Sequence, residues 1–123
     1  IIVKDGQVIS YGYNQTKNLN TIFSHAEIIA IKNAEKKLGT LYLSECDLYV
    51  NIEPCLMCSG VIIASRIKRL IFGAHEPKTG ACISKSCVFN NRELNHHTEV
   101  VGPIDNSRYS RLIKRFLKER RKA

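Results

Sequence analysis

The chain has 123 residues, of which 44% are hydrophobic and 24% charged, proportions typical of a soluble globular protein. No apolar run approaches the roughly 20 residues of a membrane-spanning helix. Five cysteines, an odd number without a visible secretory leader, argue against a disulfide framework and favour reduced thiols in the cytoplasm. The net charge is +8. We expect one domain over residues 1–123, and a natural N-terminus further upstream, because the sequence opens without Met inside an apolar run.

The first third of the chain predicts a hairpin followed by a helix. Two β-rich runs, residues 1–4 and 7–11, flank Asp5-Gly6, a dipeptide typical of tight hairpin turns. A polar loop over residues 14–21 follows. Apolar residues at 26, 29, 30 and 34 then predict a helix over 26–38, with Gly39 just beyond it as the stop signal.

The middle of the chain predicts a strand, a helix and a second strand. We expect the first strand at residues 47–52. Pro54 marks the start of a largely apolar helix over residues 55–65. The second strand is expected at residues 69–72, where Gly73 ends it.

The last third is less regular. Residues 75–95 predict a loop region with at most a short helix, and residues 98–101 predict a short strand. From Asn106, a candidate N-cap, we expect an amphipathic helix. Its apolar stripe consists of Tyr109, Leu112, Ile113, Phe116 and Leu117. Strands that alternate with helices predict an α/β sandwich.

The positive charge is concentrated in residues 108–122, called the basic segment below. It contains one acidic residue, Glu119, and eight basic ones: Arg108, Arg111, Lys114, Arg115, Lys118, Arg120, Arg121 and Lys122. The rest of the chain is nearly neutral. A local patch of this kind suits a polyanionic partner such as a nucleic acid. The alternative is a solvated helix face that serves only solubility.

Three residues have the types and spacing of a catalytic zinc site. Cys55 and Cys58 lie three apart at the predicted start of a helix, so both sulfurs share one face and can bind one ion. The positive end of the helix also favours thiolates. With the imidazole of His25 they make three protein ligands, which leaves a fourth tetrahedral position open for water. We therefore expect one Zn²⁺ per chain.

Glu27 is expected to move protons rather than bind the metal. Positions two apart on a helix point to different sides, so His25 and Glu27 should not chelate one ion together. The longer side chain of Glu27 can still reach a water activated by zinc. There it would act as a general base and then as a general acid.

Other interpretations of these motifs remain open when each is taken alone. A lone Cys-x-x-Cys pair is also found in redox dithiols and in four-cysteine structural zinc sites. The His-x-Glu motif upstream disfavours the dithiol, and the lack of a second Cys-x-x-Cys pair disfavours the structural site. We do not expect a second metal site from Cys82, Cys87, His96 and His97, and we expect Cys46 to be a buried apolar thiol.

Together, the motifs form the His-x-Glu and Pro-Cys-x-x-Cys signature of zinc nucleobase deaminases. The sequence resembles the bacterial tRNA adenosine deaminases, members of the cytidine deaminase superfamily that convert a wobble adenosine to inosine. The matching stretches cover nearly the whole chain: Gly12-Tyr13-Asn14, His25-Ala26-Glu27-Ile28, LYVNIEPCLMC at 48–58, Ser65-Arg66-Ile67, Phe72-Gly73-Ala74, Lys78-Thr79-Gly80 and Leu94-Asn95-His96.

The resemblance implies a fold, partners and further site residues. The fold is a three-layer α/β/α cytidine-deaminase-like sandwich with a central mixed sheet. The partners are a tRNA anticodon stem-loop and a second copy of the chain, in a homodimer whose two subunits both touch the RNA. Asn14 would hydrogen-bond the flipped base, Ile52 would help to wall the pocket, and Glu76 and Lys78 would lie beside the anticodon loop. From the residues alone, Asn14 is only a turn former.

The chain departs from the family pattern in several places. By this resemblance we expect residue 1 to fall after the family's N-terminal helix and within its first strand. Glu76 stands where Asp is more common, Ile83 where Gly is common, and Phe116-Leu117 where two aromatic residues are common. Two other functions compete with tRNA wobble deamination. A deaminase of a free nucleobase or nucleotide, such as guanine, cytosine or dCMP, has little use for the basic segment. An RNA-binding protein without catalysis has no need of Glu27.

Overall fold

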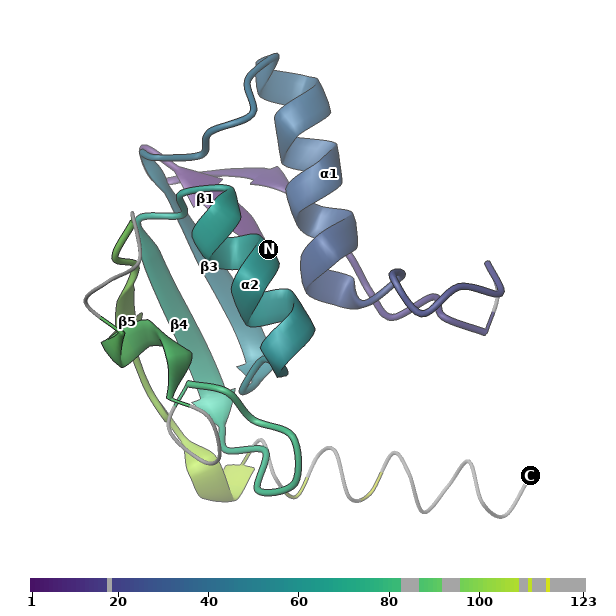
Figure 1. Cartoon of the computed structure of the whole chain (residues 1–123), viewed down its shortest axis with the longest axis vertical. Helices are drawn as coiled ribbons and strands as arrows, with labels where there is room; N and C mark the ends of the chain where they lie inside the picture. The colour runs from purple at the N-terminus through teal and green to yellow at the C-terminus, as the bar shows by residue number, and fades with distance from the viewer. Residues whose placement is uncertain (18, 83–86, 92–95, 109–110, 112–114, 116–123) are drawn as a thin grey trace.

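A computed structural model describes residues 1–17, 19–82, 87–91, 96–108, 111 and 115. Within these residues, five strands form one mixed sheet in the order β2-β1-β3-β4-β5 (Figure 1). The two edge pairs differ, because β2 is antiparallel to β1 whereas β5 is parallel to β4. The central pair, β3 and β4, is parallel.

The hairpin at the N-terminus is formed as predicted. It consists of β1 (Ile2–Lys4) and β2 (Gln7–Ser10). Asp5 and Gly6 connect them with φ values of 51° and 75°. A turn with two positive φ values matches the right-handed twist of paired strands, which explains why this dipeptide closes the hairpin.

Helix α1 (Ala26–Leu38) has the predicted bounds. Its apolar face is buried, with Ile28, Ala30, Ile31 and Ala34 at most 5% exposed. Gly39 ends the helix in the left-handed conformation, and its N–H donates to the carbonyl oxygen of Glu35. The Ser10 hydroxyl donates to the Ala30 carbonyl oxygen at 2.7 Å, which ties the helix to the end of β2.

A strand-helix-strand unit follows, and it places the two cysteines. Strand β3 (Cys46–Ile52) leads into α2 (Leu56–Ala64), and the chain returns in parallel as β4 (Arg69–Ala74). The helix starts one residue later than predicted, because Cys55 is its N-cap and Leu56 is its first helical residue. Pro54 lies just before the N-cap. The predicted end of β4 at Gly73 is wrong: the strand continues through Gly73 to Ala74, whose carbonyl oxygen accepts from the Glu53 N–H.

Helices α1 and α2 contact each other and lie over the same face of the sheet (Figure 1). The hydrophobic core lies between these helices and the strands. It includes Ile2, Ala30, Ile31, Ala34, Leu43, Cys46, Leu48, Ile62, Ile67, Leu70, Phe72 and Cys82. The buried thiol of Cys46 confirms the expectation for that residue. None of the helices in the described part of the chain has the length and apolar character that crossing a bilayer requires.

The C-terminal part holds a short 3₁₀ helix, η1 (Val88–Asn90), and the edge strand β5 (Glu99–Val101). The apolar stripe predicted for a C-terminal helix lies outside the described residues. Where that helix was expected to begin, the predicted N-cap is wrong: Asp105 precedes the helical residues 106–108, and its side chain accepts from the Arg108 N–H at 3.1 Å. Asn106 instead bonds to His75.

Candidate active site

The N-termini of α1 and α2 bring together the three predicted metal ligands. His25 is the N-cap of α1, Cys55 is the N-cap of α2, and Cys58 lies in the first turn of α2. The Nδ1 atom of His25 lies 3.5 Å from the Cys58 sulfur and 3.9 Å from the Cys55 sulfur. All three donor atoms lie within 4.8 Å of one another. One ion can therefore contact all of them.

The chemistry of this donor set fits a zinc ion. One imidazole nitrogen and two thiolate sulfurs are ligands that zinc prefers, and three of them leave room for one more. Over the described ranges, no other group of three or more His, Cys, Asp or Glu donors forms such a cluster.

The environment of Cys58 opposes the thiolate in the metal-free protein. Burial raises the pKa of the Cys58 thiol, and the nearby carboxylate of Glu27 and the sulfur of Cys55 raise it further. The sequence alone predicted only an effect in the opposite direction, because the positive N-terminal end of the helix lowers the pKa of a thiol. Burial is the largest influence on the pKa of this thiol, so the thiol keeps its proton near neutral pH until a cation binds.

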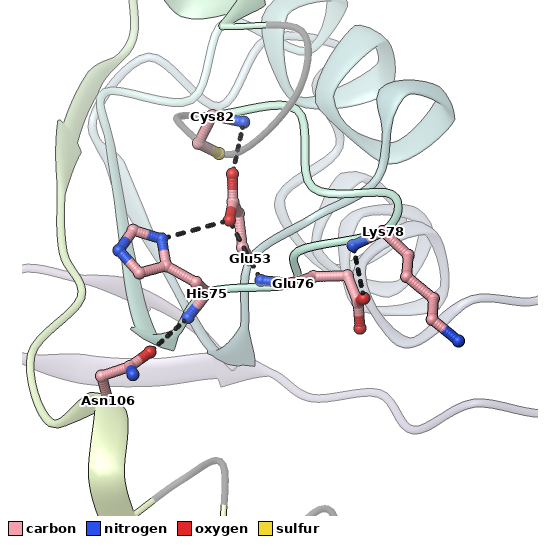
Figure 2. Close-up of polar contacts among 6 residues, drawn as sticks. All are labelled: Glu53, His75, Glu76, Lys78, Cys82 and Asn106. Atoms are coloured by element: carbon pink, nitrogen blue, oxygen red, sulfur yellow. Dashed lines mark hydrogen bonds and ion pairs between the residues drawn. The ribbon is translucent and has the colours of Figure 1, made fainter.

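A cavity of about 780 Å³ opens beside the three donors. His25, Cys55 and Glu27 line it together with three of the four residues predicted to bind substrate, Asn14, Ile52 and Glu76. The fourth, Lys78, is exposed, and its side chain extends away from the neighbouring loop residues (Figure 2). The geometry thus brings the predicted acid-base residue and most of the predicted binding residues to one hollow.

Asn14 reaches the cavity because its loop lies close against α1. A Cβ atom on Gly12 would lie 2.5 Å from the Ala26 carbonyl oxygen, so no larger residue fits there without a shift of the backbone. The Gln15 N–H donates to the Ser24 carbonyl oxygen at 2.8 Å and fixes the other side of the loop. The Asn14 side chain accepts from the Thr16 N–H and hydroxyl, both at 3.0 Å, so it also forms the turn expected from its residue type.

Sequence reasoning missed a group of polar residues next to the donor cluster. Glu53, directly before Pro54-Cys55, is 2% exposed and bonds to the loop that follows β4 (Figure 2). The signal that could have found it is an acidic residue at the end of a strand whose other positions are mostly apolar. A buried carboxylate needs partners, and they lie more than 20 residues away in sequence.

Comparison with known proteins agrees with this geometry. The sequence matches the MafB19-like deaminase family over residues 1–121, so the protein is a deaminase by class. It is 39% identical over 98% of its length to the tRNA-specific adenosine deaminase of Aquifex aeolicus (strain VF5), 80% of which is covered. The chain belongs to the tRNA-specific adenosine deaminase family.

Two solved structures extend the comparison. One comes from studies of A-to-I editing by tRNA:A34 deaminases at the wobble position of transfer RNA. It is 42% identical, with a TM-score of 0.79, over 82% of this chain and 78% of that one. The guanine deaminase of Bacillus subtilis is 29% identical, with a TM-score of 0.62, over 96% of this chain and 77% of that one. The first likeness confirms the predicted cytidine-deaminase-like fold with a mixed central sheet.

Proposed function

We propose that this protein converts adenosine to inosine at the wobble position of a tRNA anticodon, with one Zn²⁺ bound by His25, Cys55 and Cys58. The observation that carries the proposal is the convergence of these three donor atoms beside a cavity that Glu27 also lines. The tRNA substrate is taken from the relatives, which are tRNA-specific adenosine deaminases or tRNA:A34 deaminases.

In this proposal, Glu27 carries the protons. Zinc, when bound, supplies the Lewis acidity that lowers the pKa of water and makes it a nucleophile near neutral pH. A carboxylate oxygen of Glu27 accepts a proton from the attacking water and delivers it to N1 of the adenine ring as the C6–O bond forms. The same carboxylate then moves the remaining hydroxyl proton to the exocyclic amino group. The C6–N bond breaks, and ammonia and inosine are the products.

The binding residues proposed are Asn14, Ile52, Glu76 and Lys78. An RNA loop presents unstacked bases, so one adenosine can enter the cavity without the cost of opening a duplex. Asn14 would hydrogen-bond the flipped base and Ile52 would form part of the wall; both line the cavity. Glu76, also in the lining, and the exposed Lys78 would contact the anticodon loop.

The proposal includes the surroundings of this site. We propose a single deaminase domain, which the family match over residues 1–121 supports. We also propose a homodimer in which both subunits touch the anticodon stem-loop, and action in the cytoplasm, where tRNA is available and thiols stay reduced. The basic segment would bind RNA phosphates.

A second candidate function is deamination of a free nucleobase such as guanine. The likeness to the guanine deaminase of Bacillus subtilis favours it, since that relative shares the fold. The two functions differ in what they require outside the cavity. A free base needs no phosphate contacts, whereas a tRNA loop presents phosphates that the basic segment would contact in the first function.

The test is conversion of a tRNA whose anticodon is ACG by the zinc-loaded protein, read by sequencing as A-to-G change. Ammonia release from guanine, cytosine and dCMP is measured in parallel. We expect conversion of the tRNA, with Glu27→Gln lowering the rate by about 100-fold or more because the proton carrier is lost. Glu35→Gln, further along the same helix α1, is the matched control and should keep the wild-type rate.

Each outcome decides between the candidates. Ammonia release from a free base without tRNA conversion would favour the second function. Binding of the tRNA without conversion would favour a non-catalytic RNA-binding protein. Equal rates for the wild-type and Glu27→Gln proteins would overturn the role given to Glu27.

A further inference from the structure

Glu53 is a buried ionisable residue that the proposed reaction does not use. It lies between the end of β3 and Pro54, and its side chain is fully buried. A carboxylate loses its hydration on burial, which is costly unless hydrogen-bond donors replace the water. The buried carboxylate of Glu53 therefore needs hydrogen-bond partners, and those partners show which part of the chain it holds in place.

Three partners of this carboxylate belong to one short stretch of chain, residues 75–82, called the cavity loop below. One oxygen of Glu53 accepts from the Glu76 backbone N–H at 3.1 Å and lies 3.4 Å from Nδ1 of His75. The other oxygen accepts from the Cys82 backbone N–H at 3.0 Å. The carboxylate thus bonds to both ends of the cavity loop, as Figure 2 shows. Bonds that involve a charged acceptor are stronger than neutral ones.

Further contacts hold the cavity loop along the segment that carries the Cys55 sulfur. The Ala81 N–H donates to the Pro54 carbonyl oxygen at 2.9 Å, and Gly80 pairs with Cys55 in an isolated antiparallel bridge. A Cβ atom on Gly80 would lie 2.5 Å from Oε1 of Glu53, so the carboxylate fills the space that a side chain would need.

Asn106 holds the cavity loop from the opposite side. Its side-chain oxygen accepts from the His75 backbone N–H at 2.9 Å. The neighbouring residues continue this attachment along the end of β4, where the Ile104 and Asp105 N–H groups donate to the Phe72 and Gly73 carbonyl oxygens, both at 3.1 Å. His75 is thus held by Glu53 through its ring and by Asn106 through its backbone (Figure 2).

The cavity loop forms part of the cavity wall. Glu76 and Thr79 line the hollow beside His25 and Glu27. Within the loop, the Glu76 side chain accepts from the Lys78 N–H at 3.1 Å, and the Glu76 carbonyl oxygen accepts from the Gly80 N–H at 2.8 Å. A change in the direction of the loop would therefore move Glu76 and Lys78 together.

We propose that Glu53 and Asn106 are positioning residues that clamp the cavity loop in one conformation, and that this conformation sets how the anticodon loop binds. The proposal rests on the proposed function. Glu53 acts on the substrate only through the loop backbone, and Asn106 couples the loop to the start of the basic segment. Loss of either clamp should weaken RNA binding more than the chemical step.

The test compares zinc-loaded Glu53→Gln, Asn106→Ala and Asn106→Asp with the wild-type protein. Gln keeps the shape of Glu53 but turns one acceptor into an NH₂ group that faces an N–H donor. Asp at position 106 keeps an acceptor for the His75 N–H, so it should rescue what Ala loses. Glu99→Gln, at an exposed position in β5, is the control for a Glu-to-Gln change outside the clamp.

The first readout is amide hydrogen exchange by NMR, which does not depend on any substrate. We expect exchange at Glu76 and Cys82 to become about tenfold faster or more in Glu53→Gln, since a charged acceptor is lost. Exchange at His75 should become faster in Asn106→Ala and return toward the wild-type rate in Asn106→Asp. Unchanged exchange in all three variants would overturn the clamp.

The second readout is steady-state kinetics on an anticodon stem-loop, with zinc content measured alongside. We expect KM to rise by about tenfold for Glu53→Gln and Asn106→Ala, with kcat within about threefold of wild type and one zinc retained per chain. Faster exchange with an unchanged KM would overturn the link to RNA binding. A fall in kcat together with loss of zinc would overturn it in favour of a role for Glu53 in placing Cys55.

The two readouts separate this proposal from the proposed function. A wild-type protein that does not deaminate the stem-loop would contradict the proposed function. Even if that happened, faster exchange at Glu76 and Cys82 in the Glu53→Gln variant would still support the clamp. Wild-type kinetics for Asn106→Ala despite faster exchange at His75 would overturn the part assigned to Asn106.

Discussion

The three proposed metal ligands lie at two helix N-caps and in a first turn, positions that local sequence signals can indicate. The His25 and Cys55 backbones are extended, with φ values of −69° and −73°, directly before the first helical residue of α1 and of α2. Pro54 and the three-residue spacing of the cysteines indicate such a start from sequence alone. Asn106 has no such local signal, and for Glu53 the signal is only an acidic residue after a mostly apolar strand. The partners of both residues come from distant parts of the chain.

Metal binding should release protons, and its affinity should rise with pH. Burial, Glu27 and Cys55 raise the pKa of the Cys58 thiol, so the metal-free protein holds this proton throughout the neutral range. Zinc binds the thiolate, so each proton displaced raises the apparent affinity by about tenfold per pH unit. We expect this rise between about pH 6 and 8, measured by competition with a chelator whose own protonation is accounted for.

The buried thiol of Cys46 offers a matched control for this prediction. It lies in the core, outside the donor cluster, and burial raises its pKa as well. Cys46→Ala should therefore leave the pH dependence of zinc affinity unchanged, whereas Cys58→Ser should lower the affinity and change that dependence. A zinc affinity that stays constant over the same pH range would contradict the protonated state assigned to Cys58.

At the scale of elements, local rules predicted the parts of the fold that local forces determine. The Asp5-Gly6 hairpin, the bounds of α1 and the core of β3 follow from turn chemistry and periodicity. Beyond residue 75 the same reasoning predicted the short helix η1 and the strand β5, but not the conformation of the cavity loop. The cavity loop takes its conformation from Glu53 and Asn106, and periodicity carries no information about such contacts.

The cavity loop should tolerate no side chain at Gly80. A Cβ atom there would lie 2.5 Å from the Glu76 carbonyl oxygen and equally close to Oε1 of Glu53. Gly80→Ala should therefore lower the free energy of unfolding by about 1–3 kcal/mol, the usual cost of overpacking. Urea denaturation of the zinc-loaded protein measures this change.

Gly60 is the matched control for that substitution. It is exposed in α2, and a Cβ atom added there would meet no atom within 4 Å beyond its own helix backbone and chain neighbours. Since alanine is the better helix former, Gly60→Ala should raise the free energy of unfolding by about 0.5–1 kcal/mol. The two changes add the same methyl group and should have opposite signs. A Gly80→Ala protein as stable as wild type would show that the contact between Gly80 and Glu53 is not tight.

At the scale of the whole molecule, the charge distribution separates binding from chemistry. The proposed metal ligands and Glu27 lie at the helix N-termini beside the cavity, whereas the excess positive charge of the sequence lies in the basic segment. Phosphate contacts are weakened by salt because binding releases counterions, and proton transfer inside a cavity is affected far less. Salt should therefore raise KM for RNA and leave kcat nearly constant.

Neutralising two basic residues at each of two places tests this separation. Arg120→Gln with Arg121→Gln removes two charges from the basic segment, and Lys36→Gln with Lys37→Gln removes two from the last turn of α1. If both arginines contact phosphates, the slope of log affinity against log salt becomes shallower by up to about 1.4 for the first pair. The lysine pair should leave the slope unchanged. Fluorescence anisotropy with a labelled anticodon stem-loop across a salt series measures both slopes. Equal slopes for the two double variants and the wild-type protein would show that the basic segment serves solubility and that phosphate contacts lie elsewhere.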